Sequence, residues 1–259
     1  MLFDYAERWW NYSDHDDKSG GVKMRSIVGL FLSLVCVSSW SGDVLKDVPT
    51  TIDPQAKYLI YLPGLAVEMD GPDAMNRYFG KVYQMSAISK AFAEKGFTVI
   101  AEARPRGTQV DAYAKKVADQ VARLMAGGVA ARNMAVVGHS KGGAIVIAAA
   151  GEIKAADISY VVLAGCAMPH VGTLGNETPR ADYERLMAAN KGRFKGRMLS
   201  MYDAADDDFR TCKELTAANP ELKLDEQVIQ SGSPARTAHA IFFAPEAIWF
   251  EPLMQWIAR

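Results

Sequence analysis

The chain has 259 residues, of which 49% are hydrophobic, and its formal net charge is −1 at pH 7. This size and composition are enough for a sizeable buried core, and α/β folds of more than about 200 residues often form one domain. Because basic and acidic residues are interspersed, we expect no nucleic-acid partner, and no stretch after the N-terminal region is long and apolar enough for a membrane span.

The N-terminal region has the order of residues that directs proteins to export. Lys23 and Arg25 precede an apolar run over residues 27–37, and small residues follow it. A charged segment, a short apolar segment and small residues together predict a secretory signal peptide over residues 24–41. We therefore expect a secreted or periplasmic protein, without a stable membrane span once the signal is removed.

Met24 is then the expected start of translation, and residues 1–23 are an upstream extension that matches neither a signal nor a fold. The mature chain is expected to form a single domain over residues 42–259. An uncleaved membrane anchor is the alternative. A lipid on Cys36 is less favoured, because Val35 is larger than the residue that precedes the cysteine of a lipoprotein signal.

Apolar runs and amphipathic segments alternate along the rest of the chain. The expected strands cover residues 58–62, 97–103, 134–137, 158–165, 197–202 and 227–230, and the expected helices cover residues 82–95, 111–125, the segment after 140, 180–189, 209–218 and 247–258. The expected loops include residues 67–78, 203–208 and 231–239. This alternation predicts an α/β fold with a mostly parallel, doubly wound sheet flanked by helices. Ligands bind such sheets beyond the carboxyl ends of the strands.

One expected strand runs into the sequence Gly138-His139-Ser140-Lys141-Gly142, and a run of small residues with helical propensity follows. This arrangement fits G-x-S-x-G, the nucleophile elbow of α/β-hydrolases, in which a strained turn projects the serine hydroxyl above the sheet. A Cβ atom at either glycine would collide with the neighbouring backbone. We expect Ser140 to be a nucleophile. An ordinary turn between a strand and a helix is the alternative.

A serine hydroxyl needs a base within hydrogen-bonding distance, and the base needs a carboxylate that orients it. In chains with this elbow the order is serine, acid, histidine. Of the four histidines, His15 precedes the expected mature chain, His139 lies within the elbow, and His170 precedes the acidic loop. His239 is therefore the expected general base, with an ordinary surface or core histidine as the alternative.

The orienting acid is expected in the acidic loop after the strand at residues 197–202. Asp206 has the most suitable spacing from the end of that strand, and Asp203 is the second candidate. The remaining acids, Asp207 and Asp208, are expected in a solvated loop, where negative charge favours the N-terminus of the next helix.

A tetrahedral intermediate needs two backbone N–H donors, which form an oxyanion hole. One is expected from Lys141, the residue after the nucleophile, and the other from Leu65, in the loop where Gly64 lets the chain turn. The Lys141 side chain is expected in solvent, with a contribution to substrate affinity as the alternative. Arg104 and Arg106 follow another strand and are expected to be structural or solvated. Contact with an acidic substrate group is their alternative role.

Cys166 ends one expected strand, and Cys212 begins the helix after the next strand. Neighbouring parallel strands would place both cysteines near the same end of the sheet, and an exported protein permits a disulfide between them. Two buried free thiols are the alternative. No cluster has metal-ligand spacing and there is no glycine-rich phosphate loop, so neither a metal nor another cofactor is expected.

Five ordered segments carry a resemblance to the α/β-hydrolase superfamily, which extends from about Lys57 to Trp256. They are Y-L-P-G-L-A-V-E, G-F-T-V-I-A-E-A-R-P-R-G-T, V-V-G-H-S-K-G-G-A-I, V-V-L-A-G-C and L-S-M-Y-D-A-A-D. More narrowly, the chain resembles small exported bacterial serine hydrolases. It departs from them at Pro63, where many members have histidine, and around His239, where flanking glycines are common. The segment between the last two long strands is short, which implies a minimal lid and an open site.

The resemblance implies a hydrolase that cleaves carboxylic esters of small molecules through an acyl-enzyme, with Ser140, His239 and Asp206 as its catalytic triad. A thioesterase, a peptidase or an acyltransferase with the same triad is the alternative within this chemistry. A non-catalytic binding protein on a hydrolase fold is the rival from another class, and the ordered triad argues against it.

Overall fold

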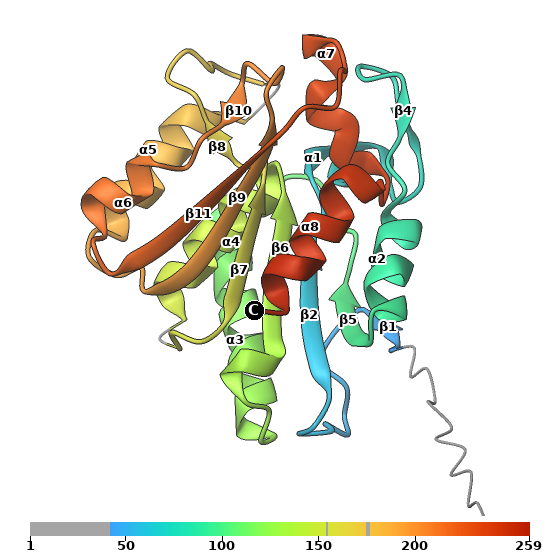
Figure 1. Ribbon diagram of the computed structural model, residues 1–259, viewed down its shortest axis with the longest axis vertical. Helices are drawn as coiled ribbons and strands as arrows, with labels where there is room; N and C mark the ends of the chain where they lie inside the picture. Colours follow the sequence, from blue (N-terminus) through green and yellow to red (C-terminus); the bar gives the residue numbers. More distant parts are fainter. Residues whose placement is uncertain (1–41, 154, 175–176) are drawn as a thin grey trace, which may run out of the picture. The chain divides into compact units, whose positions relative to one another are not determined.

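A seven-stranded sheet forms the centre of the computed structural model, which describes residues 42–153, 155–174 and 177–259 (Figure 1). Its strands are β1 (Val44–Leu45), β2 (Lys57–Leu62), β5 (Phe97–Ala101), β6 (Met134–His139), β7 (Ser159–Leu163), β9 (Gly196–Asp203) and β11 (Leu222–Ile229). The spatial order is β1-β5-β2-β6-β7-β9-β11, and all pairings in this sheet are parallel. The predicted α/β class is confirmed. The predicted upstream extension and signal peptide, residues 1–41, lie outside the described residues.

The central strands are buried because helices cover both faces of the sheet. Every residue of β6 and of β7 is buried, and strands of this kind are near-continuous apolar runs. Successive side chains point to opposite faces, so Tyr58 and Ile60 belong to one core cluster while Leu59 and Tyr61 belong to the other.

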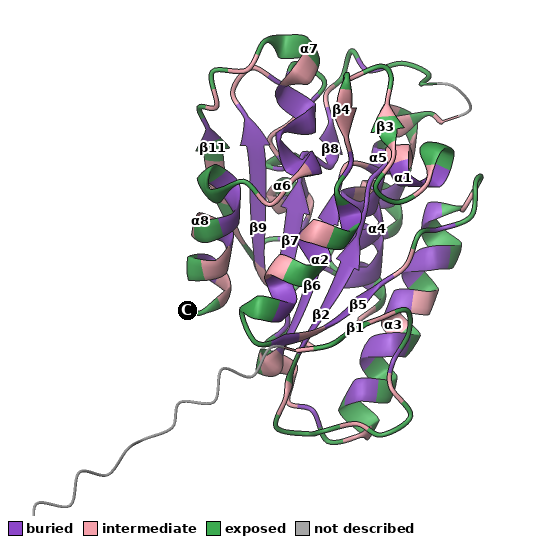
Figure 2. Cartoon of the chain, turned by 90° about the vertical axis from the view of Figure 1, so that its right-hand side faces the viewer, coloured by how far each residue is buried: buried purple, intermediate pink, exposed green. Residues whose placement is uncertain are grey.

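The helices form one layer on each face of the sheet. One layer contains α3 (Val110–Ala126), α4 (Lys141–Glu152), α5 (Pro179–Ala189) and α6 (Glu214–Ala218). The other contains α2 (Met85–Glu94), the 3-10 helix η2 (His239–Phe243) and α8 (Ala247–Ile257). Figure 2 shows the buried strands behind and between helices whose outer surfaces are exposed. None of the helices in the described ranges has the length and apolar character needed to span a membrane.

Short elements follow the carboxyl ends of the strands. They are α1 (Leu65–Asp70), β3 (Met75–Asn76), β4 (Lys81–Val82), β8 (Cys166–Ala167), β10 (Phe209–Arg210) and α7 (Ala235–Ala238), whereas η1 (Ala131–Asn133) leads into β6. β3 pairs with β4, and β8 pairs with β10, both in antiparallel orientation. These connections lie at the end of the sheet where α/β folds bind ligands.

The segment at residues 209–218 differs from its prediction as a helix. Its first two residues form β10, because they pair with β8, and only residues 214–218 are helical. The expected loop at 67–78 also begins within a helix, α1. The loop expected before residue 239 contains α7 and runs into η2.

β11 is longer than the strand predicted at residues 227–230. It lies at the edge of the sheet and includes Lys223, Asp225 and Glu226. Charged side chains are typical of sheet edges, where they oppose pairing with other chains. The strand therefore has no continuous apolar run by which its full length could be recognised.

Candidate active site

Ser140 lies in a strained turn between β6 and α4. Its φ of 54° and ψ of −121° fall outside the regions that L-amino acids usually adopt. Two glycines make room for this turn. A Cβ atom on Gly138 would lie 2.2 Å from the carbonyl oxygen of Gly142, and one on Gly142 would lie 2.0 Å from the carbonyl oxygen of Leu62. The strand, turn and helix expected around this serine are therefore present.

His239 and Asp206 form a buried hydrogen-bonded pair. Nδ1 of His239 donates to Oδ2 of Asp206 at 2.7 Å. The carboxylate is itself held by the N–H groups of Asp208 and Phe209, which donate to its Oδ1 at 3.1 and 3.0 Å. With Nδ1 as the donor, the neutral ring has its lone pair on Nε2, as a general base requires.

Asp203, the second candidate for the acid, has a different role. Its Oδ1 accepts from the N–H of Ala205 at 2.8 Å, and its Oδ2 accepts from the N–H of Ser231 at 3.1 Å. The carboxylate thus fixes the turn after β9 to the segment after β11. Asp207 and Asp208 are exposed, as expected for a solvated loop.

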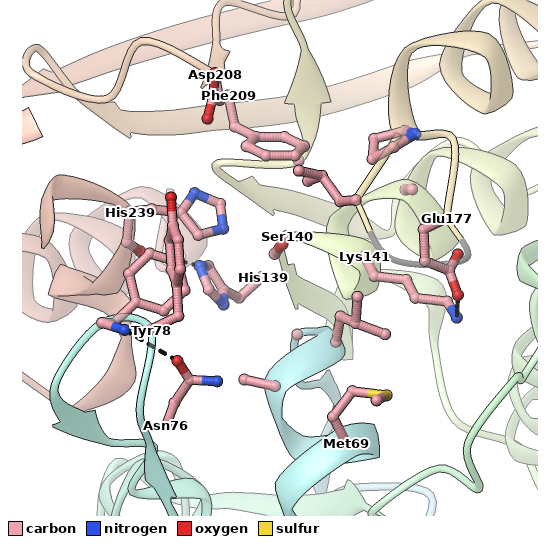
Figure 3. A pocket seen from close by; sticks show the side chains of 18 of the residues that line it. Met69, Asn76, Tyr78, His139, Ser140, Lys141, Glu177, Asp208, Phe209 and His239 are labelled. Atoms are coloured by element: carbon pink, nitrogen blue, oxygen red, sulfur yellow. Dashed lines mark hydrogen bonds and ion pairs between the residues drawn. The ribbon is translucent and has the colours of Figure 1, made fainter. Parts of the chain in front are cut away.

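Ser140 and His239 face one cavity of about 1020 Å³ (Figure 3). Phe79 stacks on the His239 ring with 5.7 Å between centroids, and the Phe209 ring lies 4.8 Å from it. In the described part of the chain the Ser140 hydroxyl makes no hydrogen bond to the His239 ring. Such contacts are often long without substrate and shorten in the substrate complex.

Leu65 and Lys141 are the first residues of α1 and α4, and both line this cavity. The first N–H groups of a helix have no carbonyl partner within it, so both can donate to a ligand. Gly64, before Leu65, has a φ of −72°, which any residue can adopt. The constraint on Gly64 is space, because a Cβ atom there would lie 2.9 Å from Nδ1 of His139. Gly64 therefore lets the chain pass close to His139 as it turns from β2 into α1.

No protein-family model and no curated protein matches this sequence. Solved structures do match the fold. Est1E from Butyrivibrio proteoclasticus, in a structure with bound ferulic acid, is 16% identical with a TM-score of 0.50, and the match covers 82% of this chain and 94% of that one. The monoacylglycerol lipase of Paleococcus ferrophilus is 14% identical with a TM-score of 0.50, and the match covers 77% and 93% of the two chains.

The chain has the α/β-hydrolase fold. The elbow after β6, the carboxylate after β9 and the histidine after β11 follow one another in the order that this fold uses. At such low identity the likeness establishes the architecture. It does not transfer an activity, because one fold carries many functions.

The Lys141 side chain is buried in this α/β-hydrolase fold, so the expectation of a solvated lysine is wrong. Its Nζ lies 3.0 Å from Oε2 of Glu68 and 2.9 Å from Oε1 of Glu177. Glu68 belongs to α1, and Glu177 lies two residues before the start of α5. The lysine therefore joins the elbow to two other parts of the cavity wall.

Arg104 completes this buried network. Its Nε donates to Oε1 of Glu68 at 2.8 Å, and its Nη2 donates to the carbonyl oxygen of Pro63. These contacts link α1 to the residue that directly follows β2, so Arg104 is structural, as expected. Arg106 is exposed, lines the cavity and donates to the carbonyl oxygen of Met69.

His139 is a buried polar residue beside the candidate base, and the sequence interpretation assigned it no role. Its ring centroid lies 4.7 Å from that of His239. Burial holds the pKa of His139 well below its usual value, and the nearby His239 lowers it further. The available signal was a histidine at the end of an otherwise apolar strand, a position where a polar side chain needs a partner.

Cys166 and Cys212 are paired as a disulfide with their Cα atoms 5.4 Å apart. Cys166 lies in β8, after β7, and Cys212 closely follows β10, after β9. Since β7 and β9 are neighbours in the main sheet, the cysteines meet near the same sheet end, as expected. Across residues 42–153, 155–174 and 177–259, no group of three or more His, Cys, Asp or Glu side chains is arranged to hold a metal ion.

Proposed function

We propose that this protein is a serine hydrolase that cleaves carboxylic esters of small molecules through an acyl-enzyme. The Ser140 hydroxyl attacks the ester carbonyl while Nε2 of His239 takes the proton, and Asp206 stabilises the imidazolium. The oxyanion accepts hydrogen bonds from the N–H groups of Leu65 and Lys141. The imidazolium then protonates the leaving alcohol, and water, activated by His239, attacks the acyl carbon and releases the acid and Ser140.

The 2.7 Å hydrogen bond between His239 and Asp206 carries this proposal. A carboxylate on Nδ1 leaves Nε2 free as a base, and it does so in the cavity that holds the strained Ser140. Ser140, His239 and Asp206 all line this cavity, and both members of the hydrogen-bonded pair are buried.

The cavity wall supports a neutral ester as the substrate. Five carboxylates and three cationic side chains line the cavity, so its wall has an excess of two negative charges. The carboxylates are those of Glu177, Asp182, Asp206, Asp207 and Asp208, and the cations are those of Arg106, Lys141 and Arg236. A negative field disfavours strongly anionic carrier thioesters. Apolar and aromatic residues such as Met69, Phe79, Leu174 and Phe243 favour an apolar acyl group.

A fluorophosphonate probe tests the nucleophile. We expect the folded wild-type protein to be labelled at Ser140 and the Ser140→Ala variant to lose both labelling and ester turnover. Ser200→Ala is the matched control, because this buried serine in β9 has an Oγ with no hydrogen-bond partner in the described residues. Labelling that persists in Ser140→Ala would contradict the proposal, and a wild-type protein without labelling would favour a binding protein.

Turnover of an ester, a thioester and an amide with the same acyl group tests the reaction class. We expect the neutral ester to have the highest kcat/KM. A preference for the thioester would assign the triad to a thioesterase, and a preference for the amide would assign it to a peptidase. Transfer of the acyl group to an alcohol in place of water would indicate an acyltransferase.

We also propose that the protein is exported. The signal-like sequence over residues 24–41 supports this, and so does the pairing of Cys166 with Cys212, because disulfides persist in oxidising compartments. Cell fractionation and N-terminal sequencing of the mature chain test the proposal. A cytosolic protein that retains residues 24–41 would contradict it.

A further inference from the structure

A chain of buried hydrogen bonds runs behind the cavity. The hydroxyl of Tyr61 lies 2.9 Å from that of Tyr83, which lies 3.2 Å from Nδ1 of His139. Two backbone groups join this chain. The N–H of Gly64 donates to the Tyr83 hydroxyl at 3.1 Å, and Nε2 of His139 lies 3.2 Å from the carbonyl oxygen of His239. Tyr61, Tyr83 and His139 are each 1% exposed.

The direction of each hydrogen bond follows from the chemistry of the groups. A carbonyl only accepts, so Nε2 of His139 carries the proton and donates to His239. Nδ1 of the neutral ring is then an acceptor, and the Tyr83 hydroxyl is its donor. Because Tyr83 has one proton to give, the Tyr61 hydroxyl must donate to Tyr83. Burial supports the neutral forms, since it lowers the pKa of His139 and raises that of Tyr83 to about 12.

This chain connects three segments that come from different strands. Gly64 follows β2 and precedes Leu65, His139 is the last residue of β6 and precedes Ser140, and His239 begins η2 after β11. Packing at the junction is tight, because a Cβ atom on Gly64 would lie 2.9 Å from Nδ1 of His139 and 3.3 Å from Cβ of Ser140. α1 and η2 are each too short to hold their own geometry, so tertiary contacts must position them.

We propose that Tyr83 and His139 are positioning residues. Through hydrogen bonds with fixed donors and acceptors, they hold the Leu65 N–H, Ser140 and His239 in fixed positions relative to one another. This inference rests on the proposed function of those three groups. His139 acts only as the neutral tautomer with its proton on Nε2. The Nδ1–H tautomer would place a lone pair of Nε2 against the carbonyl oxygen of His239, so the segment that begins with His239 would lose this hydrogen bond.

Tyr83→Phe removes the central hydroxyl and leaves the Gly64 N–H and Nδ1 of His139 without partners. We expect kcat for a short-chain ester to fall between about 10- and 100-fold, because small displacements of reacting groups have effects of this size. KM should change by less than about threefold, since the cavity wall remains. Tyr160→Phe is the matched control, because the buried Tyr160 hydroxyl has no hydrogen-bond partner among the described residues.

The 15N spectrum of the histidine rings in the full-length wild-type protein tests the tautomer without reference to activity. We expect His139 to be the neutral Nε2–H form at pH 7, and Tyr83→Phe to broaden or shift its Nδ1 resonance while Tyr160→Phe does not. A His139 in the Nδ1–H form, or a Tyr83→Phe enzyme with kcat within about twofold of the wild type, would overturn the inference.

If Tyr83→Phe does not fold, the wild-type spectrum decides the outcome. Fluorophosphonate labelling of the wild type separates the two proposals. An unlabelled protein with the Nε2–H form of His139 would overturn the proposed function while the hydrogen-bond chain stands. A labelled protein with the other tautomer would overturn only the positioning role.

Discussion

Glu68 and Lys141 form a buried ion pair, with Oε2 and Nζ 3.0 Å apart, between the two helices whose first residues line the cavity. Arg104 holds the other oxygen of Glu68 at 2.8 Å. The carboxylate therefore lies between two cations and joins the Leu65 segment to the elbow. Since α1 has only six residues, this network supplies contacts that the helix cannot make within itself.

Glu68→Gln should lower the free energy of unfolding by about 3 kcal/mol, because it leaves two buried cations without their shared carboxylate. Urea unfolding measures this change. Glu94→Gln is the matched substitution, since Glu94 is exposed and pairs with the exposed Lys90 at 3.5 Å. Exposed pairs of this kind contribute less than about 1 kcal/mol. Equal losses in the two variants would show that the buried network does not stabilise the fold.

Asp206→Asn should reduce kcat for an ester by about 10²- to 10⁴-fold, because the amide no longer fixes the His239 tautomer or stabilises its charged form. Steady-state kinetics give this value. Asp203→Asn is a close control, because both residues are buried aspartates and Asp203 ends β9 just before the turn that contains Asp206. Asp203 binds only backbone N–H groups, so its variant should lose stability and keep kcat within about threefold. A larger kcat effect at Asp203 would reverse the assignment of the acid.

The buried His139 predicts acid sensitivity. An unfolded histidine has a pKa of about 6.5, whereas burial holds the pKa of folded His139 well below that value. As the pH falls below about 6.5, the unfolded chain binds a proton that the folded chain excludes, so the free energy of unfolding decreases. This decrease continues as the pH falls toward the pKa of folded His139.

His139→Gln should remove that part of the pH dependence, although the variant is less stable at every pH. Urea unfolding at several pH values gives the slope for each protein. His170→Gln, at an exposed position, provides the comparison. If both variants keep the slope of the wild type, protonation of His139 does not contribute to acid unfolding.

Reduction of the disulfide should destabilise the protein by roughly 2 to 4 kcal/mol, because Cys166 and Cys212 are 46 residues apart and the cross-link restricts the unfolded chain. Thermal unfolding with and without reductant measures the effect. The double variant Cys166→Ala and Cys212→Ala should melt at one temperature under both conditions. A wild type with the same Tm in both conditions, after mass spectrometry has shown free thiols, would contradict the prediction.

Several features were predictable because their signals are local. A β-branched run followed by Gly138, Ser140 and Gly142 specifies a strand, a strained turn and a helix, since only glycine fits where a Cβ atom would meet the backbone. Chain order alone selected His239 among the four histidines. The choice of Asp206 over Asp203 also followed from spacing, and the structure brings the Asp206 carboxylate to the ring.

Other features depend on contacts between distant residues, and their sequence signals are weak. Lys141 looks like a surface residue until α1 brings Glu68 to it, 73 positions away in the chain. β10 lies where helical propensity is evident, yet pairing with β8 makes residues 209 and 210 a strand. The length of β11 is hidden by the charges that protect a sheet edge.

By itself the sequence determined the alternation of strands and helices, the elbow and the order of the candidate triad, because each depends on side-chain periodicity, glycine sterics or position along the chain. Only the tertiary structure decided which polar side chains are buried and which partners they bind. It also decided that the hydrogen bonds of Tyr83 and His139 join three segments of the protein. Those outcomes depend on the cost of burying a polar group without a partner, and the partners come from elements far apart in the sequence.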